Sequence, residues 1–358
     1  MFIFDSHCDT PSQIYRGRDV CIDNAYAHVD FPKMERGGVG AAFFALYTPA
    51  ERSQPEAALY VQRMIAGVRD AVRRSNGRVR LGAHPSEVPG NQAAGCMTVF
   101  LGMENASPIG ESLELLRWFA RMGVRYITLT HNGDNAVADS AADGSHWNGL
   151  SPFGRRAVAE MNRLGIMADV SHASDKTFWD CLEVSEKPII ASHSSCRALC
   201  GHRRNLTDEM LQALGEKGGY VGINLYPSFL RDDFGKRPEE AALLDEADRV
   251  EGAFIADPSD PDARSAWNRM QERLKTLHRP DIRDVVDHID RAVRFAGIDH
   301  VGIGTDYDGI CVPPAGLETV ADLPVIFDEM RRRGYDEKAV SQVAGGNLLR
   351  VFNEIVSC

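Results

Sequence analysis

The stretch FIFDSHCD, residues 2–9, begins as an apolar strand and ends on a His-Cys-Asp tripeptide. In a (β/α) barrel the carboxyl ends of the parallel strands meet at one mouth, where enzymes of this fold carry out their chemistry. Six strand ends that deliver His, Asp and Glu to one mouth predict a metal-dependent hydrolase. The five later apolar stretches of this kind end at Glu104, His131, His172, His193 and Asp306.

Apolar strands and amphipathic helices alternate along the chain, which is typical of a parallel sheet with crossover helices. Residues 228–279 interrupt the alternation with charged residues and several prolines, and we interpret them as an insertion or lid with one or two helices. The sequence thus predicts an α/β protein in which residues 1–358 form a single (β/α)8 TIM-like barrel of the metal-dependent hydrolase type, with the insertion after strand seven. The expected strands are residues 2–6, 40–46, 97–102, 125–130, 166–170, 188–192, 220–225 and 300–305.

The composition limits the partners and the compartment that the sequence favours. The chain of 358 residues has a formal net charge of −11, which argues against nucleic acid and an anionic membrane surface as partners. The sequence shows no apolar run near the roughly 20 residues of a membrane helix and no signal-peptide pattern. Eight scattered cysteines form no CxxC pair and are typical of reduced thiols. We therefore expect a cytoplasmic enzyme.

His7 and Asp9 form an HxD pair at the end of the first strand. In an extended segment residues i and i+2 point to the same side, so both side chains can hold one metal ion. Imidazole and carboxylate ligands suit Zn²⁺, Mn²⁺ or Fe²⁺. Taken alone, the pair is better explained as a hydrogen-bonded histidine beside a solvated aspartate. The further candidate ligands downstream favour a metal site instead.

Three further residues extend this candidate metal site. Glu104, which could instead be a surface carboxylate, can bridge two metal ions, because cations about 3.5–4 Å apart need an anion between them. His172 and His193 end consecutive strands and could bind a second metal. One such histidine is often structural, but two on neighbouring strands, together with the HxD pair, favour a binuclear centre.

Other residues near strand ends are candidates for catalysis and substrate binding. Asp306 could take a proton from a metal-activated water and pass it to a leaving amine, whereas Asp308 is expected to cap the next loop. His131 could donate to a carbonyl oxygen or a tetrahedral oxyanion. Arg203 and Arg204 form either a solvent-facing basic pair or a site at the barrel mouth for a substrate carboxylate.

Together these residues resemble the membrane (renal) dipeptidase family, the zinc dipeptidases among the amidohydrolase-type barrels. The resemblance implies a microbial-type member of peptidase family M19 that hydrolyses dipeptides with a hydroxide shared by two zinc ions. It also implies tolerance of a D-residue at the C-terminal position. The matching motifs occur in the family's order over nearly the whole chain: DSHCDTP (5–11), GMEN (102–105), LTHN (129–132), DVSH (169–172), SHSS (192–195), RRN (203–205), GIGTDYDG (302–309) and GNLLRVF (346–352).

The resemblance implies a metal ligand role for five residues. One Zn²⁺ would be bound by His7 and Asp9, the other by His172 and His193, and both by the bridging Glu104. The family often has Asn between its first His and Asp, where this chain has a cysteine at position 8. Because alternate side chains of a strand point to opposite sides, we interpret that cysteine as a packing residue and not as a ligand.

The resemblance also implies roles for three residues around the metals, and it suggests a homodimer. His131 would contact the scissile-bond oxygen or the tetrahedral intermediate, Arg204 would bind the C-terminal carboxylate of the substrate, and Asp306 would be the proton shuttle. A longer peptide would then place no carboxylate within reach of Arg204.

Two alternatives remain open. The first is another binuclear metal-dependent amidohydrolase, such as an N-acyl amino acid deacetylase or a lactonase-like enzyme. Many of these use a carbamylated lysine as the bridge, whereas no lysine ends a predicted strand here and Glu104 lies in that place. The second is a non-catalytic barrel, which should lack a ligand or the shuttle. The sequence contains a candidate for each of them.

Overall fold

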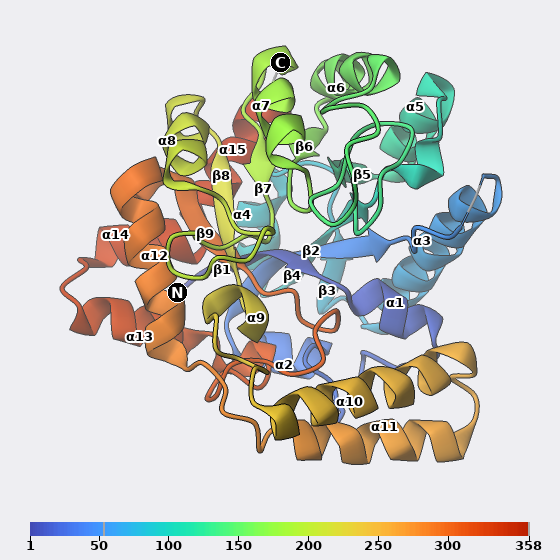
Figure 1. Cartoon of the computed structure of the whole chain (residues 1–358), viewed down its shortest axis with the longest axis vertical. Helices are drawn as coiled ribbons and strands as arrows, with labels where there is room; N and C mark the ends of the chain where they lie inside the picture. The colour runs from blue at the N-terminus through green and yellow to red at the C-terminus, as the bar shows by residue number, and fades with distance from the viewer. Residues whose placement is uncertain (53, 357–358) are drawn as a thin grey trace.

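The fold is built on one parallel β-sheet whose ends meet to form a nearly closed barrel (Figure 1). The computed structural model describes residues 1–52 and 54–356. Among the strands in these residues, eight follow one another in the order β1-β2-β4-β5-β6-β7-β8-β9, which confirms the predicted (β/α)8 TIM-like barrel. The strands are β1 (Ile3–Cys8), β2 (Val39–Tyr47), β3 (Val79–Leu81), β4 (Met97–Glu104), β5 (Val124–Thr128), β6 (Met167–Asp169), β7 (Ile190–Ala191), β8 (Tyr220–Asn224) and β9 (Val301–Gly304).

The barrel closes where residues 301–309 run beside residues 3–9, a junction that we call the β9–β1 seam. The backbone N–H of Asp306 donates to the carbonyl of His7 (3.0 Å), and that of Asp9 donates to the carbonyl of Tyr307 (2.8 Å). Within the described residues the seam has an isolated bridge between Cys8 and Tyr307 in place of a continuous ladder. The first and last strands are therefore joined mainly at their carboxyl ends.

Strand β3 is the element that the sequence did not predict. It pairs with the first half of β4, from Val79–Met97 to Leu81–Val99, and β5 pairs with the second half of the same edge. Its sequence, VRL, has a single buried residue, Val79, so no apolar run marks it as a strand. It adds a ninth strand to the sheet without entering the barrel path.

Two apolar clusters flank the strands. One lies between the strands and the surrounding helices. The other joins strand side chains to the last helix, where Phe352 contacts the rings of Phe43 and Phe100 at centroid distances of 5.3 and 5.1 Å. This second cluster packs on the early residues of most strands, so the opposite, carboxyl ends remain available for polar side chains. Its members are Phe4, Ala41, Phe43, Val88, Phe100, Tyr126, Met167, Ile190, Tyr220, Leu348, Val351, Phe352 and Ile355.

Several helices begin at residues whose side chains cap them. The hydroxyl of Thr207 accepts a hydrogen bond from the backbone of Met210, and that of Ser151 accepts one from Gly154, ahead of a proline at the first helical position. Outside the insertion the helices are α1 (Thr10–Tyr15), α2 (Phe31–Arg36), α3 (Glu56–Arg74), α4 (Glu87–Ala93), α5 (Leu113–Met122), α6 (Pro152–Leu164), α7 (Asp175–Val184), α8 (Asp208–Glu216), α12 (Ile282–Ala296), α13 (Pro324–Arg332), α14 (Glu337–Ser341) and α15 (Asn347–Val356).

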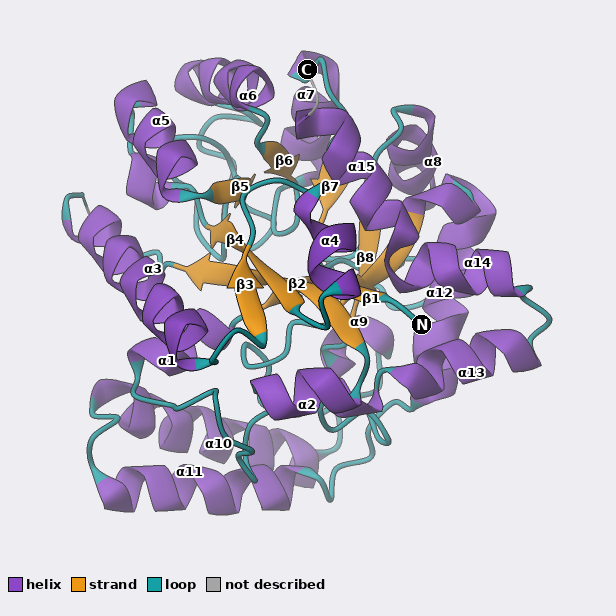
Figure 2. Ribbon diagram, turned by 180° about the vertical axis from the view of Figure 1, so that it is seen from behind, coloured by secondary structure: helices purple, strands orange, loops and turns teal. Residues whose placement is uncertain are grey.

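Residues 228–279 contain two long helices beside the barrel, in line with the predicted one or two. They are α10 (Pro238–Ala256) and α11 (Pro261–Leu274), preceded by the short α9 (Pro227–Leu230). Figures 1 and 2 show α10 and α11 side by side, outside the ring of barrel helices. Their facing sides bury a separate apolar cluster that includes Phe254 and Trp267.

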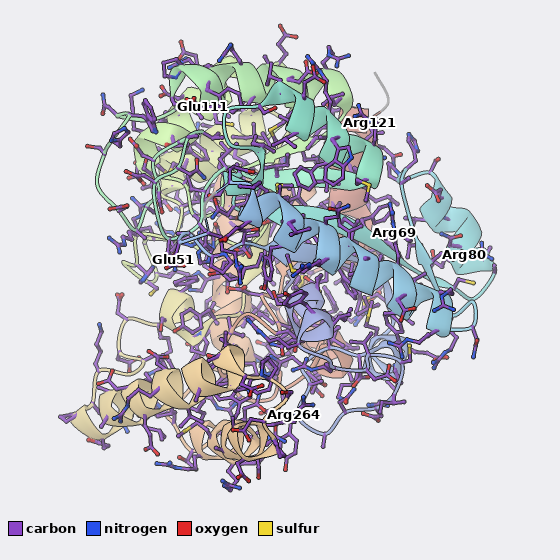
Figure 3. All side chains as sticks on the ribbon, turned by 90° about the vertical axis from the view of Figure 1, so that its right-hand side faces the viewer. Glu51, Arg69, Arg80, Glu111, Arg121 and Arg264 are labelled. Atoms are coloured by element: carbon purple, nitrogen blue, oxygen red, sulfur yellow. The ribbon has the colours of Figure 1, made fainter. Side chains whose placement is uncertain are left out.

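The outer surface is strongly charged. Figure 3 labels Arg69, Arg121 and Arg264 among the side chains drawn as sticks, and all three are exposed. A search of the described helices finds none whose length and apolar character would let it cross a membrane.

Candidate active site

The predicted site residues meet at one end of the barrel. His7 lies on β1 and Glu104 is the last residue of β4. Asp9, His131, His172, His193 and Asp306 lie within three residues of a strand end, and Arg204 lies in the longer loop between β7 and α8. Several of them line a cavity of about 330 Å³, together with Tyr47, Tyr226 and Phe229. The candidates that line this cavity are Asp9, Glu104, His131, His172 and Asp306.

Glu104 lies at the centre of this group. Its Oε2 is 3.6 Å from Nε2 of His7, and its Oε1 is 3.1 Å from Nε2 of His172 and 3.5 Å from Nε2 of His193. Asp9 approaches from the side of His7, with its Oδ2 3.4 Å from Nε2 of that histidine. The two oxygens of one carboxylate thus face different histidines, while the ligand atoms of His7, Glu104 and His193 also lie within 4.8 Å of one another.

The donor set fits divalent cations. Ligand atoms that bind one tetrahedral Zn²⁺ at 2.0–2.1 Å lie roughly 3.3 Å apart, and the Nε2 atoms of His172 and His193 are 3.0 Å apart. The Nε2 of His7 and the Oδ1 of Asp9 are buried and form no hydrogen bond within the part of the chain that the structure describes. Buried polar atoms without partners are rare, and a cation satisfies both of these.

The pKa shifts of the site residues also fit a site for divalent cations. Burial and the neighbouring carboxylate of Glu104 raise the pKa of Asp9 to about 7, against the opposing effect of His7. Burial opposes a charge on His7, but Glu104 and Asp9 outweigh it and raise its pKa. Burial lowers the pKa of His172 and His193, which keeps both imidazoles neutral, the form that binds metals.

Buried polar side chains behind the histidines orient their rings. The hydroxyl of Ser192 lies 2.6 Å from Oδ2 of Asp169 and 2.8 Å from Nδ1 of His193. Since the hydroxyl donates its one proton to the carboxylate, it accepts from Nδ1–H of His193 and leaves Nε2 free for a metal. The hydroxyl of Tyr126 lies 2.8 Å from Nδ1 of His7 in the same way.

Sequence reasoning did not find this supporting set. Asp169 and Ser192 were read as parts of predicted strands, and Tyr126 as an apolar strand residue. Only the strand register brings Asp169 beside Ile190, two residues before Ser192. A signal was present, because a buried strand rarely carries an aspartate without a partner.

Asp306 lies across the seam from His7, with 4.0 Å between its Oδ1 and Nε2 of the histidine. Its Oδ2 accepts a hydrogen bond from the side-chain amide of Asn224 (2.9 Å). Burial and the charge of Asp9 raise its pKa. Its φ of +60° and that of His172, +68°, are left-handed values that non-glycine residues rarely adopt. Such strain clusters at functional sites.

His131 and Arg204 lie on the other side of Glu104. The Nε2 of His131 is 3.9 Å from Oε1 of Glu104, and its ring packs against that of Tyr47. Burial and the nearby Arg204 lower the pKa of His131 to about 3, so the imidazole is neutral at physiological pH. The motif alone left the role of the arginine pair open, and the family resemblance implied that Arg204 binds the substrate. The structure separates the two residues, since Arg203 is exposed and Arg204 is 5% exposed.

Within residues 1–52 and 54–356 the buried guanidinium of Arg204 forms no ion pair with a carboxylate, although the charges of Asp306 and Glu104 act on it from a greater distance. It donates to the carbonyl of His193 (3.3 Å) and to the hydroxyl of Ser194 (3.5 Å), and it lies over the ring of Phe229. Its Nε has no partner among the described groups. Burial lowers its pKa to about 10, which leaves it charged at neutral pH. A buried, unpaired cation beside the cavity suits an anionic ligand group.

Two other sequence interpretations can be compared with the structure. Cys8 is buried with its thiol directed to the carbonyl of Phe43 (3.5 Å), in line with a packing role. The expectation that Asp308 caps the following loop is wrong. Its carboxylate instead pairs with Arg18 and accepts a hydrogen bond from Thr10, because the chain folds back onto the segment after β1.

The insertion contributes to the same cavity. Asp248, Glu251 and Ile255 share one face of α10, at a spacing of three and four residues, and all three line it. Burial raises the pKa of Glu251 to about 6, while Arg16 opposes that change. The side of the cavity that faces away from the metal ligands is thus partly acidic.

Comparisons with known proteins agree with this geometry. The chain matches the family model described as membrane dipeptidase (peptidase family M19) over residues 1–358. It is 34% identical over 357 residues to the dipeptidase aclJ of Aspergillus oryzae, a match that covers 96% of this chain and 74% of that protein. It is 30% identical to the dipeptidase verJ of Clonostachys rogersoniana, covering 94% of this chain and 78% of that one.

Solved structures show the same fold. The probable dipeptidase PvdM of Pseudomonas aeruginosa has a TM-score of 0.84 and 27% identity to this chain, covering 100% of this chain and 96% of its own. A metallo peptidase of Rhodobacter sphaeroides, solved with a phosphinate mimic of the dipeptide L-Ala-D-Ala, has a TM-score of 0.82 and 26% identity, covering 99% of both chains.

Proposed function

Since the chain belongs to the membrane dipeptidase family and is a metallo-dipeptidase, we propose that it cleaves dipeptides with two Zn²⁺ ions bridged by Glu104 and accepts a D-residue at the C-terminal position. The observation that carries the proposal is the position of Glu104, whose two oxygens face different histidines. The likeness to an enzyme solved with a mimic of L-Ala-D-Ala supports the stereochemical part.

In this proposal His7 and Asp9 hold one Zn²⁺ and His172 and His193 hold the other. The spacing of their ligand atoms and the unpartnered atoms of His7 and Asp9 support the assignment. When bound, such cations lower the pKa of a coordinated water toward about 7 and polarise a carbonyl oxygen. The hydrogen bond from His193 to Ser192 keeps Nε2 of that histidine unprotonated and directed at the site.

Asp306 and His131 supply the proton chemistry around the scissile bond. The carboxylate of Asp306, held at Oδ2 by Asn224, keeps Oδ1 directed at the metal ligands, where it takes a proton from water and passes it to the leaving amine. His131 is neutral and can donate one hydrogen bond to the oxygen on which negative charge develops. Its packing against Tyr47 fixes the plane of the ring.

Arg204 selects for substrates that end one residue after the scissile bond. Its buried guanidinium pairs with the C-terminal carboxylate, so a dipeptide satisfies both the metal site and the arginine. A peptide amide removes the charge, and a longer peptide moves it out of reach. The Rhodobacter enzyme's ligand has the dipeptide length that this geometry requires.

The test is a substrate panel with purified, metal-analysed enzyme. We expect zinc-dependent turnover of L-Ala-L-Ala and L-Ala-D-Ala, abolished by a chelator and restored by Zn²⁺, with little turnover of L-Ala-D-Ala amide or a tripeptide. Two bound zinc ions per chain without dipeptide turnover would contradict the proposal and favour another amide or ester substrate, such as an N-acyl amino acid or a lactone. One metal per chain at full activity would contradict the binuclear assignment.

Arg204→Ala tests the carboxylate site. It should raise KM for free-carboxylate dipeptides by roughly ten- to hundredfold, since a hydrogen bond to a charged group contributes about 1.5–3 kcal/mol. The exposed neighbour provides a matched control, Arg203→Ala, which should leave KM unchanged. An equal loss on dipeptides and on their amides would refute the role of Arg204.

We also propose that the enzyme acts in the cytoplasm, because all seven cysteines in the described part of the chain are free thiols. Cell fractionation with an antibody to the protein tests this. The homodimer stays a prediction, which light scattering of the purified enzyme can check.

A further inference from the structure

Asp308, the second aspartate of the GIGTDYDG motif, takes no part in the chemistry proposed above, yet its side chain is 1% exposed. Its Oδ1 pairs with Nη1 of Arg18 (2.6 Å), and its Oδ2 accepts a hydrogen bond from the hydroxyl of Thr10 (2.9 Å). Both carboxylate oxygens are therefore engaged by donors from the segment that follows β1. A carboxylate held in this way is poorly suited to accept a proton, but it can fix a loop.

The backbone of Asp308 is anchored as well. Its N–H donates to Nδ1 of His28 (3.1 Å), and its carbonyl accepts a hydrogen bond from the side chain of Gln13 (3.2 Å). One residue thus connects the loop after β9 to α1, to the turn that follows α1 and to the loop before α2. These contacts join parts of the chain that are 280 to 298 residues apart.

The residues on each side of these contacts belong to the active site. Thr10 directly follows the candidate metal ligand Asp9, and Asp306 precedes Asp308 by two residues. Gly309 packs closely against both Asp9 and Asp306. A Cβ atom at this position would lie 2.2 Å from Oδ2 of Asp9 and 3.0 Å from Oδ1 of Asp306. The loop after β9 therefore rests directly on the candidate metal ligand.

The same loop has a strained backbone. Asp306 and Asp308 have φ values of +60° and +68°, and such conformations in non-glycine residues persist only where surrounding contacts enforce them. Asp308 holds the loop to the rest of the chain through two contacts of its side chain and two of its backbone. Without them, relaxation of the loop would move Asp306 relative to Asp9.

We propose that Asp308, through its ion pair with Arg18, is a positioning residue that sets Asp306 against Asp9 across the β9–β1 seam. The inference rests on the proposed roles of Asp306 and Asp9. A positioning role differs from a purely structural role in what changes when the ion pair is lost. A structural ion pair changes stability and nothing else, whereas a positioning pair changes the geometry of the metal ligands and kcat in a protein that remains folded.

The test compares Asp308→Asn and Arg18→Gln with a matched control, Glu160→Gln. Glu160 is also a nearly buried carboxylate paired with arginines, Arg117 and Arg163, but it lies on α6 and does not line the cavity. Each variant is loaded with Zn²⁺ for kinetics on L-Ala-D-Ala and with Co²⁺ for visible absorption, which reports ligand geometry without reference to activity. Metal per chain is measured by mass spectrometry.

We expect Asp308→Asn and Arg18→Gln to lower kcat about ten- to hundredfold, because a displacement near 1 Å at a reacting group can cost about a hundredfold. KM and metal per chain should stay within about threefold, and the Co²⁺ spectrum should change. Glu160→Gln should keep the wild-type kcat and spectrum. Wild-type kcat and spectrum in Asp308→Asn would overturn the inference, as would a loss of kcat that only matches the unfolded fraction.

Two further outcomes separate this inference from the proposed function. If the wild-type enzyme binds metal but cleaves no dipeptide, the proposed function fails and the Co²⁺ spectra alone decide the role of Asp308. If Asp308→Asn does not fold, Arg18→Lys takes its place, because it keeps the charge and changes only the geometry of the pair. A shifted spectrum in Arg18→Lys supports the inference, and an unshifted one overturns it.

Discussion

The β2–β4 pair and the β9–β1 seam hold their strands in different ways. The first is a regular parallel ladder that runs without a shift from Ala41–Thr98 to Tyr47–Glu104. The seam has few backbone pairs, and its contacts come largely from side chains, such as the carboxylate of Asp5, which accepts from the backbone and hydroxyl of Thr305 (2.9 and 2.7 Å). Backbone register fixes one side of the site, and side chains fix the other.

This difference explains how the two carboxylates with proposed roles in the reaction, Glu104 and Asp306, are placed. Glu104 is the last residue of a long ladder, so the register that forms the sheet also sets its position. Asp306 lies beyond the end of β9 in a strained conformation, and its position depends on Asn224 and on the contacts of Asp308. We therefore expect substitutions at the seam to affect turnover first and substitutions in the ladder to affect stability first.

The largest effect should come from Asp306→Asn, which removes the proposed proton carrier at the seam. General acid–base catalysis contributes about 10²- to 10⁴-fold, so kcat should fall by that factor while metal content and the melting temperature remain near wild type. Steady-state kinetics with metal analysis of the same sample gives the answer. Near-native kcat would show that another group carries the proton.

In the β2–β4 ladder, Phe43→Ala should lower stability and leave turnover nearly unchanged. Phe43 is fully buried and its ring contacts those of Phe4, Phe100 and Phe352. Its loss should lower the free energy of unfolding by about 3–5 kcal/mol, because burial is lost and a cavity remains. Denaturant unfolding measures the change. A fall in kcat per folded molecule of more than a few fold would contradict the expectation that ladder substitutions affect stability before turnover.

Much of the site was predictable because its residues follow apolar runs that read as strands. His193 and Asp306 are examples, since each comes within two residues of such a run and barrel geometry makes the ends converge. The seam was not predictable in this way. Nothing in the local sequence shows that Asp308 meets Arg18, 290 positions away, so the sequence predicted only a loop cap at Asp308.

The supporting residues behind the histidines were missed for a different physical reason. Ser192 and Asp169 lie inside predicted strands, where a pattern of alternation cannot distinguish a polar residue that has a buried partner from one that faces solvent. Strand β3 was missed because its exposed Arg80 breaks the apolar run. Both failures concern residues whose environment is created by a neighbouring strand and not by their own segment.

Ser192→Ala extends the comparison to the junction of β6 and β7, where a single residue pair joins the two strands. Loss of the hydroxyl between Asp169 and His193 should weaken metal affinity about ten- to hundredfold, as is typical when a histidine ligand loses its orienting partner. Competition with a chromophoric chelator measures the affinity. Ser195→Ala is the control, since in the described part of the chain its hydroxyl donates one hydrogen bond, to the carbonyl of Asn224. Equal losses in both variants would contradict the orienting role of Ser192.

The smallest effect is a difference in the pH dependence of stability between two buried carboxylates, Asp5 in the seam and Glu160 on the outer helix α6. Burial raises the pKa of Asp5 from 3.8 to about 6, despite its hydrogen bonds from Thr305. A raised pKa means that the folded state holds the proton more tightly, so this stabilisation is present at low pH and is lost as pH rises through about 6. The pKa of Glu160 is lowered to about 2 by its hydrogen bond with Arg163, against burial and with help from Arg117, so its stabilisation is present above 4.5 and is lost only as pH falls toward 2.

The two variants Asp5→Asn and Glu160→Gln should therefore separate between pH 4.5 and 7. With metal removed by a chelator, the stability advantage of wild type over Asp5→Asn should shrink by about 2 kcal/mol across this range, which follows from the two pKa values of Asp5. The advantage over Glu160→Gln should stay constant there and decrease only in more acidic solution. Denaturant unfolding at each pH measures both. If the two pH profiles are parallel, burial does not raise the pKa of Asp5 relative to that of a carboxylate on an outer helix. The seam and the outer helices would then differ only in geometry.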